Sequence, residues 1–250
     1  MGDELLRNVK LTIEYDGTRY HGWQRQANAA TIQQELEEGI ARVVGHAVTL
    51  YGSGRTDAGV HALGQVAHFR TSSRIPAGQL PHAINAAIPA DIAVVRAEDV
   101  SADFHARYSA KRKTYRYSIV NRPVRPAVGA AFVYWLRLPL DLAAMRLAAE
   151  RFLGEHDFAA FESHSAGEGT VRTVLRSEWL RDGERLDYWV TANGFLYNMV
   201  RAMVGTLIEI GASRRPPEDV ARLLATRDRK LAGRTAPAKG LCLMSVDYDL

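Results

Sequence analysis

The sequence has little cysteine: Cys242 is the only one among 250 residues. One thiol can neither close a disulfide within the chain nor build a cysteine zinc site, which excludes a disulfide scaffold and a zinc ribbon. No apolar run approaches the ~20 residues of a membrane span. The acidic start at Asp3 and Glu4 is followed by no apolar signal core. Hydrophobic residues still make up 47% of the chain, so we expect a globular cytoplasmic protein.

Lysine is also scarce, since the 32 basic residues are overwhelmingly arginine. The planar guanidinium group suits recognition of phosphates and nucleobases. The formal net charge of +4 is by itself a weak indication of a nucleic-acid partner. A coding sequence rich in G and C also raises arginine and alanine usage, so composition leaves this question open.

Several catalytic motifs are missing. Gly52-Ser53-Gly54 lacks both the Walker lysine and the dinucleotide pattern, and a Gly-x-Ser-x-Gly nucleophile motif is absent. The histidines show no metal-ligand spacing with a carboxylate, and we interpret them as structural or RNA-contacting: His61, His68, His82, His105, His156 and His164. Nucleotide cofactors, metal ions and serine or cysteine nucleophiles therefore lack support.

Hydrophobic periodicity predicts an α+β protein with two ferredoxin-like halves, whose antiparallel sheets form a central cleft. Thr31 is expected to cap the first helix, with Gln34 reaching back in a capping box. The join is expected near 101–109, giving domains 1–108 and 109–250. An irregular segment is expected at 163–169.

In the first half the expected strands are 9–16, 48–52, 65–70 and 92–95, and the helices are 31–44 and 79–87. In the second half the expected strands are 113–119, 131–135, 171–179, 186–192 and 241–249, and the helices are 141–153, 197–211 and 217–226.

The segment Gly54–His61 holds an acid and a base, Asp57 and Arg55, two positions apart in a turn flanked by glycines. The turn is expected to connect two strands, and loops on rigid scaffolds often carry chemistry. The alternative is that Asp57 caps the turn while Arg55 is solvated.

Two further segments carry candidate residues. On the strand at 113–119, Tyr115 and Tyr117 share one face, and the neighbouring arginines suit unstacked bases and phosphates. The alternative is that both tyrosines are core. Arg201 lies beside the apolar stripe of its helix, where it either extends to solvent or pairs with an anion, for which Asp57 is a candidate.

Three motifs together resemble the tRNA pseudouridine synthase A family: Gly54–Ala62, Lys113–Tyr117 and Gly194–Arg201. The resemblance extends to four other segments, Tyr15–Thr18, His21–Gln24, Phe104–Arg107 and His156–Phe161. The matching positions therefore run from near the N-terminus to the final helices.

The resemblance implies a homodimeric enzyme without a cofactor that converts uridines in the tRNA anticodon stem-loop, at family positions 38, 39 and 40, to pseudouridine. Asp57 matches the catalytic aspartate, and Arg201 matches the arginine that pairs with it. Tyr115 matches the tyrosine that stacks on the target uracil, Arg55 matches a basic residue that helps displace the base, and Leu243 is expected to contact the substrate.

Two other readings remain open from the residues alone. One is a non-catalytic RNA-binding or RNA-folding module that uses the same basic residues. The other is a metal-dependent or nucleotide-dependent enzyme, because the ferredoxin-like fold hosts many unrelated activities.

Overall fold

The computed structural model describes residues 6–163 and 169–248. It has two compact units, the first formed by residues within 1–111 and 243–250, the second by residues 112–242. The final segment thus groups with the first unit, while the expected domains 1–108 and 109–250 stay a prediction. Of the expected irregular segment, residues 164–168, including His164, lie outside the described residues.

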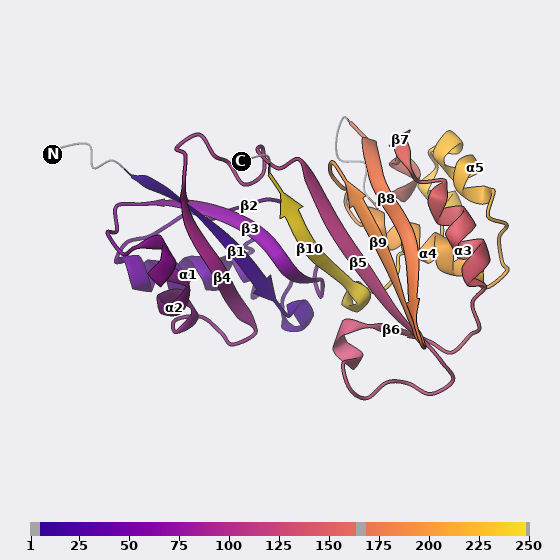
Figure 1. Cartoon of the computed structure of the whole chain (residues 1–250), viewed down its shortest axis with the longest axis horizontal. Helices are drawn as coiled ribbons and strands as arrows, with labels where there is room; N and C mark the ends of the chain where they lie inside the picture. Colours follow the sequence, from indigo (N-terminus) through magenta and orange to yellow (C-terminus); the bar gives the residue numbers. More distant parts are fainter. Residues whose placement is uncertain (1–5, 164–168, 249–250) are drawn as a thin grey trace. The chain divides into compact units, whose positions relative to one another are not determined.

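The first unit is a sheet covered by two helices (Figure 1). β1 pairs antiparallel with both β3 and β4, and the short β2 pairs with β3. The residues of β10 from Leu243 on belong to this unit. In chain order the elements are β1 Arg7–Tyr15, α1 Ile32–Val44, β2 Tyr51–Gly52, β3 His61–Thr71, α2 Leu80–Asn85, β4 Ile92–Val100 and β10 Leu241–Asp247.

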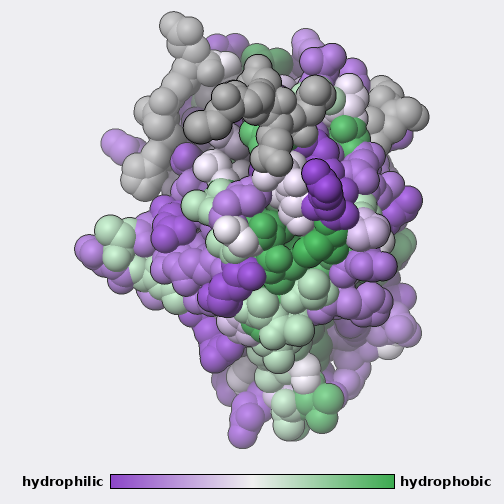
Figure 2. Space-filling model, turned by 90° about the vertical axis from the view of Figure 1, so that its left-hand side faces the viewer, coloured by the Kyte–Doolittle hydropathy of each residue, from purple (hydrophilic) through white to green (hydrophobic). Residues whose placement is uncertain are grey.

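Alternation along β1 builds the core of this unit. Leu11 and Ile13 are fully buried, as are Leu36 and Ile40 on α1 and Ile84 on α2. Side chains two apart on a strand and four apart on a helix share one face, so the two patterns meet in one apolar layer. Figure 2 shows a mostly hydrophilic surface on this side of the molecule, with apolar residues gathered near the centre of the view.

The second unit is also a mostly antiparallel sheet with helices. Its strand order is β5-β9-β8-β7, with β6 parallel to β5. Tyr117, Trp179 and Tyr188 are its largest buried side chains, and α4 contributes a nearly continuous apolar surface. The elements are β5 Arg112–Asn121, β6 Tyr134–Leu136, α3 Leu142–Glu150, β7 Gly154–Asp157, β8 Val171–Asp182, β9 Arg185–Ala192, α4 Met199–Gly211 and α5 Asp219–Thr226.

These elements confirm a mixed α and β protein with mainly antiparallel strands. None of the described helices is long and apolar enough to cross a membrane. Close packing of α4 depends on Gly205, where a Cβ atom would lie 1.6 Å from the carbonyl oxygen of Arg234.

Two local expectations were wrong, and one short strand was not expected. Thr31 does cap α1 by accepting from the Gln34 N–H at 3.4 Å, but the Gln34 side chain donates to Glu38 instead of completing a capping box. The expected strand 48–52 shortens to β2, because the side chains of Glu37 and Gln33 take the N–H and the carbonyl of Leu50. The unexpected strand, β7, escaped notice because its sequence does not alternate.

His68 is a buried titratable group on β3. Its Nδ1 accepts a hydrogen bond from the Ala106 N–H at 3.1 Å, and its ring stacks on Tyr51 with centroids 5.2 Å apart. Burial, together with the nearby His105, lowers the pKa of His68 to about 4. The folded protein therefore holds this imidazole neutral.

We predict that His68 makes the fold acid-sensitive. The folded-state pKa lies below the ordinary value of about 6.5, so the unfolded chain binds the proton first and the free energy of unfolding falls between about pH 6.5 and 4. The total effect is at most about 3 kcal/mol. In urea titrations across this pH range, the His68→Gln variant should lose much of the decline in the free energy of unfolding. The control variant His82→Gln, at an exposed histidine, should show the same decline as the unmodified protein. Equal pH profiles for both variants would contradict the assignment.

Candidate active site

The loop between β2 and β3 carries the candidate acid Asp57. The Ser53 N–H donates to the Val66 carbonyl at 2.7 Å, and the Val60 N–H donates to the Asp57 carbonyl at 3.1 Å. Gly59 adopts the left-handed conformation, with φ of 76°. The glycine-flanked turn expected between two strands is therefore confirmed as a turn with a fixed backbone.

Thr56 anchors this loop to the start of the chain. It is buried, its Oγ1 lies 2.7 Å from the Tyr15 hydroxyl, and its carbonyl accepts from the Trp23 N–H at 3.1 Å. Asp57, the next residue, is half-buried. The sequence reasoning missed Thr56 and Tyr15 as supports, although both lie in the matched motifs.

Two glycines allow the chain to approach this loop closely. A Cβ atom on Gly17 would lie 2.0 Å from the Val60 carbonyl oxygen, and one on Gly22 would lie 2.5 Å from that of Thr56. Gly22 also has a φ of 89°. Any larger residue would have to displace the backbone on either side of Asp57.

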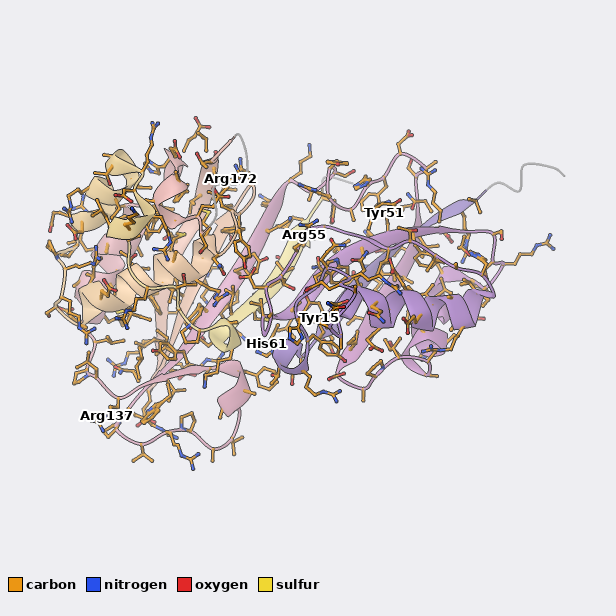
Figure 3. The ribbon with its side chains drawn as sticks, turned by 180° about the vertical axis from the view of Figure 1, so that it is seen from behind. Tyr15, Tyr51, Arg55, His61, Arg137 and Arg172 are labelled. Carbon is orange, nitrogen blue, oxygen red and sulfur yellow. The ribbon has the colours of Figure 1, made fainter. Side chains whose placement is uncertain are left out.

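Arg55 is exposed and lies on the same loop (Figure 3). Its Nε donates to Gln24 Oε1 at 3.1 Å, and Gln24 in turn donates to Gln33 on α1 at 2.8 Å. The guanidinium is thus oriented by a chain of amides while most of it stays accessible. This placement suits an anionic ligand such as a phosphate.

His61, at the start of β3, makes contacts that support a structural role. Its ring is buried, and Nδ1 accepts from the Gly17 N–H at 3.1 Å. The same nitrogen lies 3.2 Å from Asp16 Oδ1. Because the lone pair of Nδ1 accepts the hydrogen bond from the Gly17 N–H, we interpret the close Asp16 carboxylate as a neighbour and not as a salt-bridge partner.

In the second unit, the two tyrosines of β5 have different environments. Tyr117 is fully buried, donates to the Pro237 carbonyl at 2.8 Å, and has a pKa raised by burial. Tyr115 is 8% exposed, with its ring edge-on to Phe195 at 5.1 Å between centroids. Tyr117 is therefore core, whereas Tyr115 has an aromatic neighbour that fixes its ring plane.

Arg201 is held at the first turn of α4. Nε donates to the Ala236 carbonyl at 2.8 Å, and Nη1 donates to Asn198 Oδ1 at 2.6 Å. The side chain is half-buried. These bonds fix the guanidinium plane, so the alternative of a side chain extending freely to solvent does not describe this residue.

The structure places the predicted site residues in two groups. Asp57, Arg55 and Leu243 belong to the first unit, and Tyr115 and Arg201 belong to the second. Leu243 is 1% exposed on β10. Within residues 6–163 and 169–248, no three histidine, cysteine, aspartate or glutamate side chains gather as a metal-binding group.

Comparison with known proteins identifies the family. A family described as tRNA pseudouridine synthase matches residues 11–109 and 148–249. The chain belongs to the tRNA pseudouridine synthase family. Pseudouridine synthases rearrange their substrate without net loss of atoms, so the chain is an isomerase.

Individual relatives match the sequence of this chain along nearly its whole length. The tRNA pseudouridine synthase A of Syntrophotalea carbinolica is 52% identical over 96% of this chain and 96% of its own. That of Caldicellulosiruptor saccharolyticus is 46% identical over 97% of this chain and 100% of its own. A solved archaeal box H/ACA sRNP Nop10-Cbf5 complex aligns with a TM-score of 0.37 at 12% identity, over 80% of this chain and 43% of that one, a likeness too low for argument.

We predict that Gly22→Ala damages both stability and isomerase activity. The added methyl meets Thr56 and the positive φ is unfavourable, so the free energy of unfolding should fall by about 1–3 kcal/mol and turnover should fall with it. Gly45→Ala is the matched control, because Gly45 has a φ of 81° with no atom within 4 Å of the added Cβ. It should cost about 1 kcal/mol and leave turnover intact. Equal effects of the two changes in urea unfolding and turnover would refute the close-contact argument.

Proposed function

We propose that the chain converts uridines of the tRNA anticodon stem-loop to pseudouridine with Asp57 as the catalytic group. The observation that carries the proposal is the placement of Asp57, half-buried beside the anchored Thr56, in a chain of this family. The choice of the anticodon stem-loop rests on the resemblance to synthase A.

The reaction needs no redox partner or water to balance. The bond from N1 to C1′ breaks, the freed uracil rotates, C5 joins C1′, the C5 proton leaves and N1 gains a proton. A carboxylate can assist either by attacking C1′ or by removing the C2′ proton to give a glycal. Both routes start from Asp57, and we propose that neither uses a cofactor.

The remaining site residues have complementary roles in the proposal. The ring of Tyr115 stacks on the detached uracil, and its orientation against Phe195 supports that role. The family resemblance assigns Arg201 the role of stabilising a charged catalytic carboxylate. Leu243 provides an apolar contact for the substrate.

The target base has to leave its stack before it reaches Asp57, which costs a few kcal/mol. Arg55 is suited to fill the vacated space, because its guanidinium is exposed and oriented by Gln24. A planar cation can stack on the neighbouring base and bind phosphate at the same time.

Each unit is proposed to be a ferredoxin-like half. In the first unit the order β1-α1-β2-β3-α2-β4 and the antiparallel pairs of β1 with β3 and β4 support this assignment. We also propose that the domains are residues 1–108 and 109–250, that the protein forms a homodimer, and that it is located in the cytoplasm.

We predict that Asp57→Asn abolishes pseudouridine formation while tRNA affinity stays nearly unchanged, because phosphate contacts dominate binding. Tritium release from tRNA labelled at uridine C5, run with EDTA and no added cofactor, measures turnover, and filter binding measures affinity. Asp182→Asn, an exposed carboxylate at the end of β8, is the control and should match the unmodified protein. Turnover by Asp57→Asn would disprove the catalytic assignment.

We also predict that Arg201→Ala lowers both stability and turnover. Ala236 and Asn198 would lose their charged donor, which costs about 1–3 kcal/mol for partly buried groups. Arg181→Ala is the control, because Arg181 is exposed and also donates to a carbonyl, that of Gly183. Thermal unfolding and tritium release should separate the two variants. An unchanged melting temperature and turnover in Arg201→Ala would exclude both roles.

A further inference from the structure

Three ring side chains of the first unit, Tyr51, His105 and Tyr108, form a continuous cluster that we call the aromatic platform. The centroid of His105 lies 5.6 Å from that of Tyr51 and 4.3 Å from that of Tyr108. Below them, His68 lies 4.7 Å from His105 and 5.2 Å from Tyr51. The platform thus has a buried aromatic base and an outer row of rings.

The outer rings are accessible to solvent. Tyr108 is 77% exposed and Tyr51 is 49% exposed, whereas His68 is buried. Tyrosines so exposed can present a ring face to a ligand at little cost in conformational entropy. Adjacent exposed rings therefore differ from a single surface aromatic residue, which needs no functional explanation.

Hydrogen bonds hold the segment that carries His105 and Tyr108. Asn8 Nδ2 donates to the carbonyls of Ser101 and Phe104, each at 2.9 Å. Ala106 is held on both sides, donating its N–H to His68 and accepting from the Tyr248 hydroxyl at 2.7 Å. Ligand binding would not have to order this segment, so the platform is preorganised.

Two further hydrogen bonds fix the ring of His105. Its Nδ1 accepts from the N–H groups of Arg107 at 3.1 Å and Tyr108 at 3.4 Å. This ring joins the two tyrosines, so its fixed position sets the spacing of the whole row.

Two arginines lie close to the platform. The Arg107 guanidinium lies 5.8 Å from the centroid of the Tyr108 ring, and Arg70 donates to the Ala102 carbonyl at 3.2 Å. Among the described residues, no carboxylate forms an ion pair with either arginine; Asp103, the one carboxylate in 101–111, is exposed. Rings beside such cations match the needs of a base with its phosphate.

We propose that the aromatic platform binds an unpaired nucleobase of the RNA substrate, with Arg107 and Arg70 facing its phosphates. This inference rests on the proposed function, because it takes RNA to be the substrate. It adds a contact at residues that the family resemblance does not assign to the catalytic steps.

The platform and the catalytic loop are separated along β3. His68 is seven residues beyond His61, about 23 Å at the usual rise of a strand. Figure 3 labels Tyr51 well apart from His61 and Tyr15. A folded RNA is large enough to contact both ends of β3, so the platform would help select tRNA over short oligonucleotides.

The test measures affinity without requiring catalysis. Fluorescence anisotropy with end-labelled tRNA, at a fixed salt concentration, compares Tyr108→Ala, Tyr108→Phe and Val95→Ala. Removing the ring should weaken binding roughly tenfold, and phenylalanine should preserve affinity because stacking needs only a ring. Val95 on β4 is 56% exposed in the same unit, so Val95→Ala controls for loss of a surface apolar side chain. Tyr51→Ala provides a second, independent variant.

Tritium release under the same conditions separates the two proposals. We expect Tyr108→Ala to raise KM with little change in kcat, since Asp57 and its loop are untouched. Equal tRNA affinity for all variants would overturn the platform while leaving the proposed isomerase activity standing. Failure of the unmodified protein to bind any tRNA would also overturn it. Ring-dependent binding without turnover would support the platform and refute the proposed function instead.

Discussion

The arrangement of the loop that carries the candidate acid Asp57 depends on the hydrogen bond between Thr56 and Tyr15. Tyr15 is the last residue of β1, whose fully buried residues Leu11 and Ile13 belong to the core of the first unit, so the loop is tied to a core strand. The Trp23 N–H and the close contacts of Gly17 and Gly22 add restraints from a second segment. A carboxylate has to be held within a fraction of an ångström to act on a chosen atom, and these contacts provide that precision for the backbone beside Asp57.

The candidate groups in the two units are of different kinds. The first holds the acid on a turn, with Arg55 exposed beside it. The second offers the ring of Tyr115 on a strand and the guanidinium of Arg201 at the first turn of a helix, each fixed by its own neighbours. Each candidate group is therefore positioned by contacts within its own unit.

Much of the fold was predictable because local periodicity and global packing agree here. The helix expected after Thr31 is α1, and the alternating stretch near residue 9 is β1. Predictions failed where side chains replaced backbone partners, as Glu37 and Gln33 do at Leu50. The prediction of Asp57 and Tyr115 as site residues came from motifs. The residues that support them are Thr56, which bonds to Tyr15, and Phe195, which packs against Tyr115. Both contacts join segments that are distant in sequence, and periodicity does not reveal such contacts.

The sequence by itself determined the α and β class, the family and the candidate acid, because strand and helix periods and short motifs are written in consecutive residues. Only the tertiary structure decided that Tyr117 is core while Tyr115 keeps some exposure, and that Arg201 is fixed by Ala236 and Asn198. It also decided that Tyr51, His105 and Tyr108 meet. The physical reason is that burial and ring contacts depend on how distant segments pack, and no local pattern carries that information.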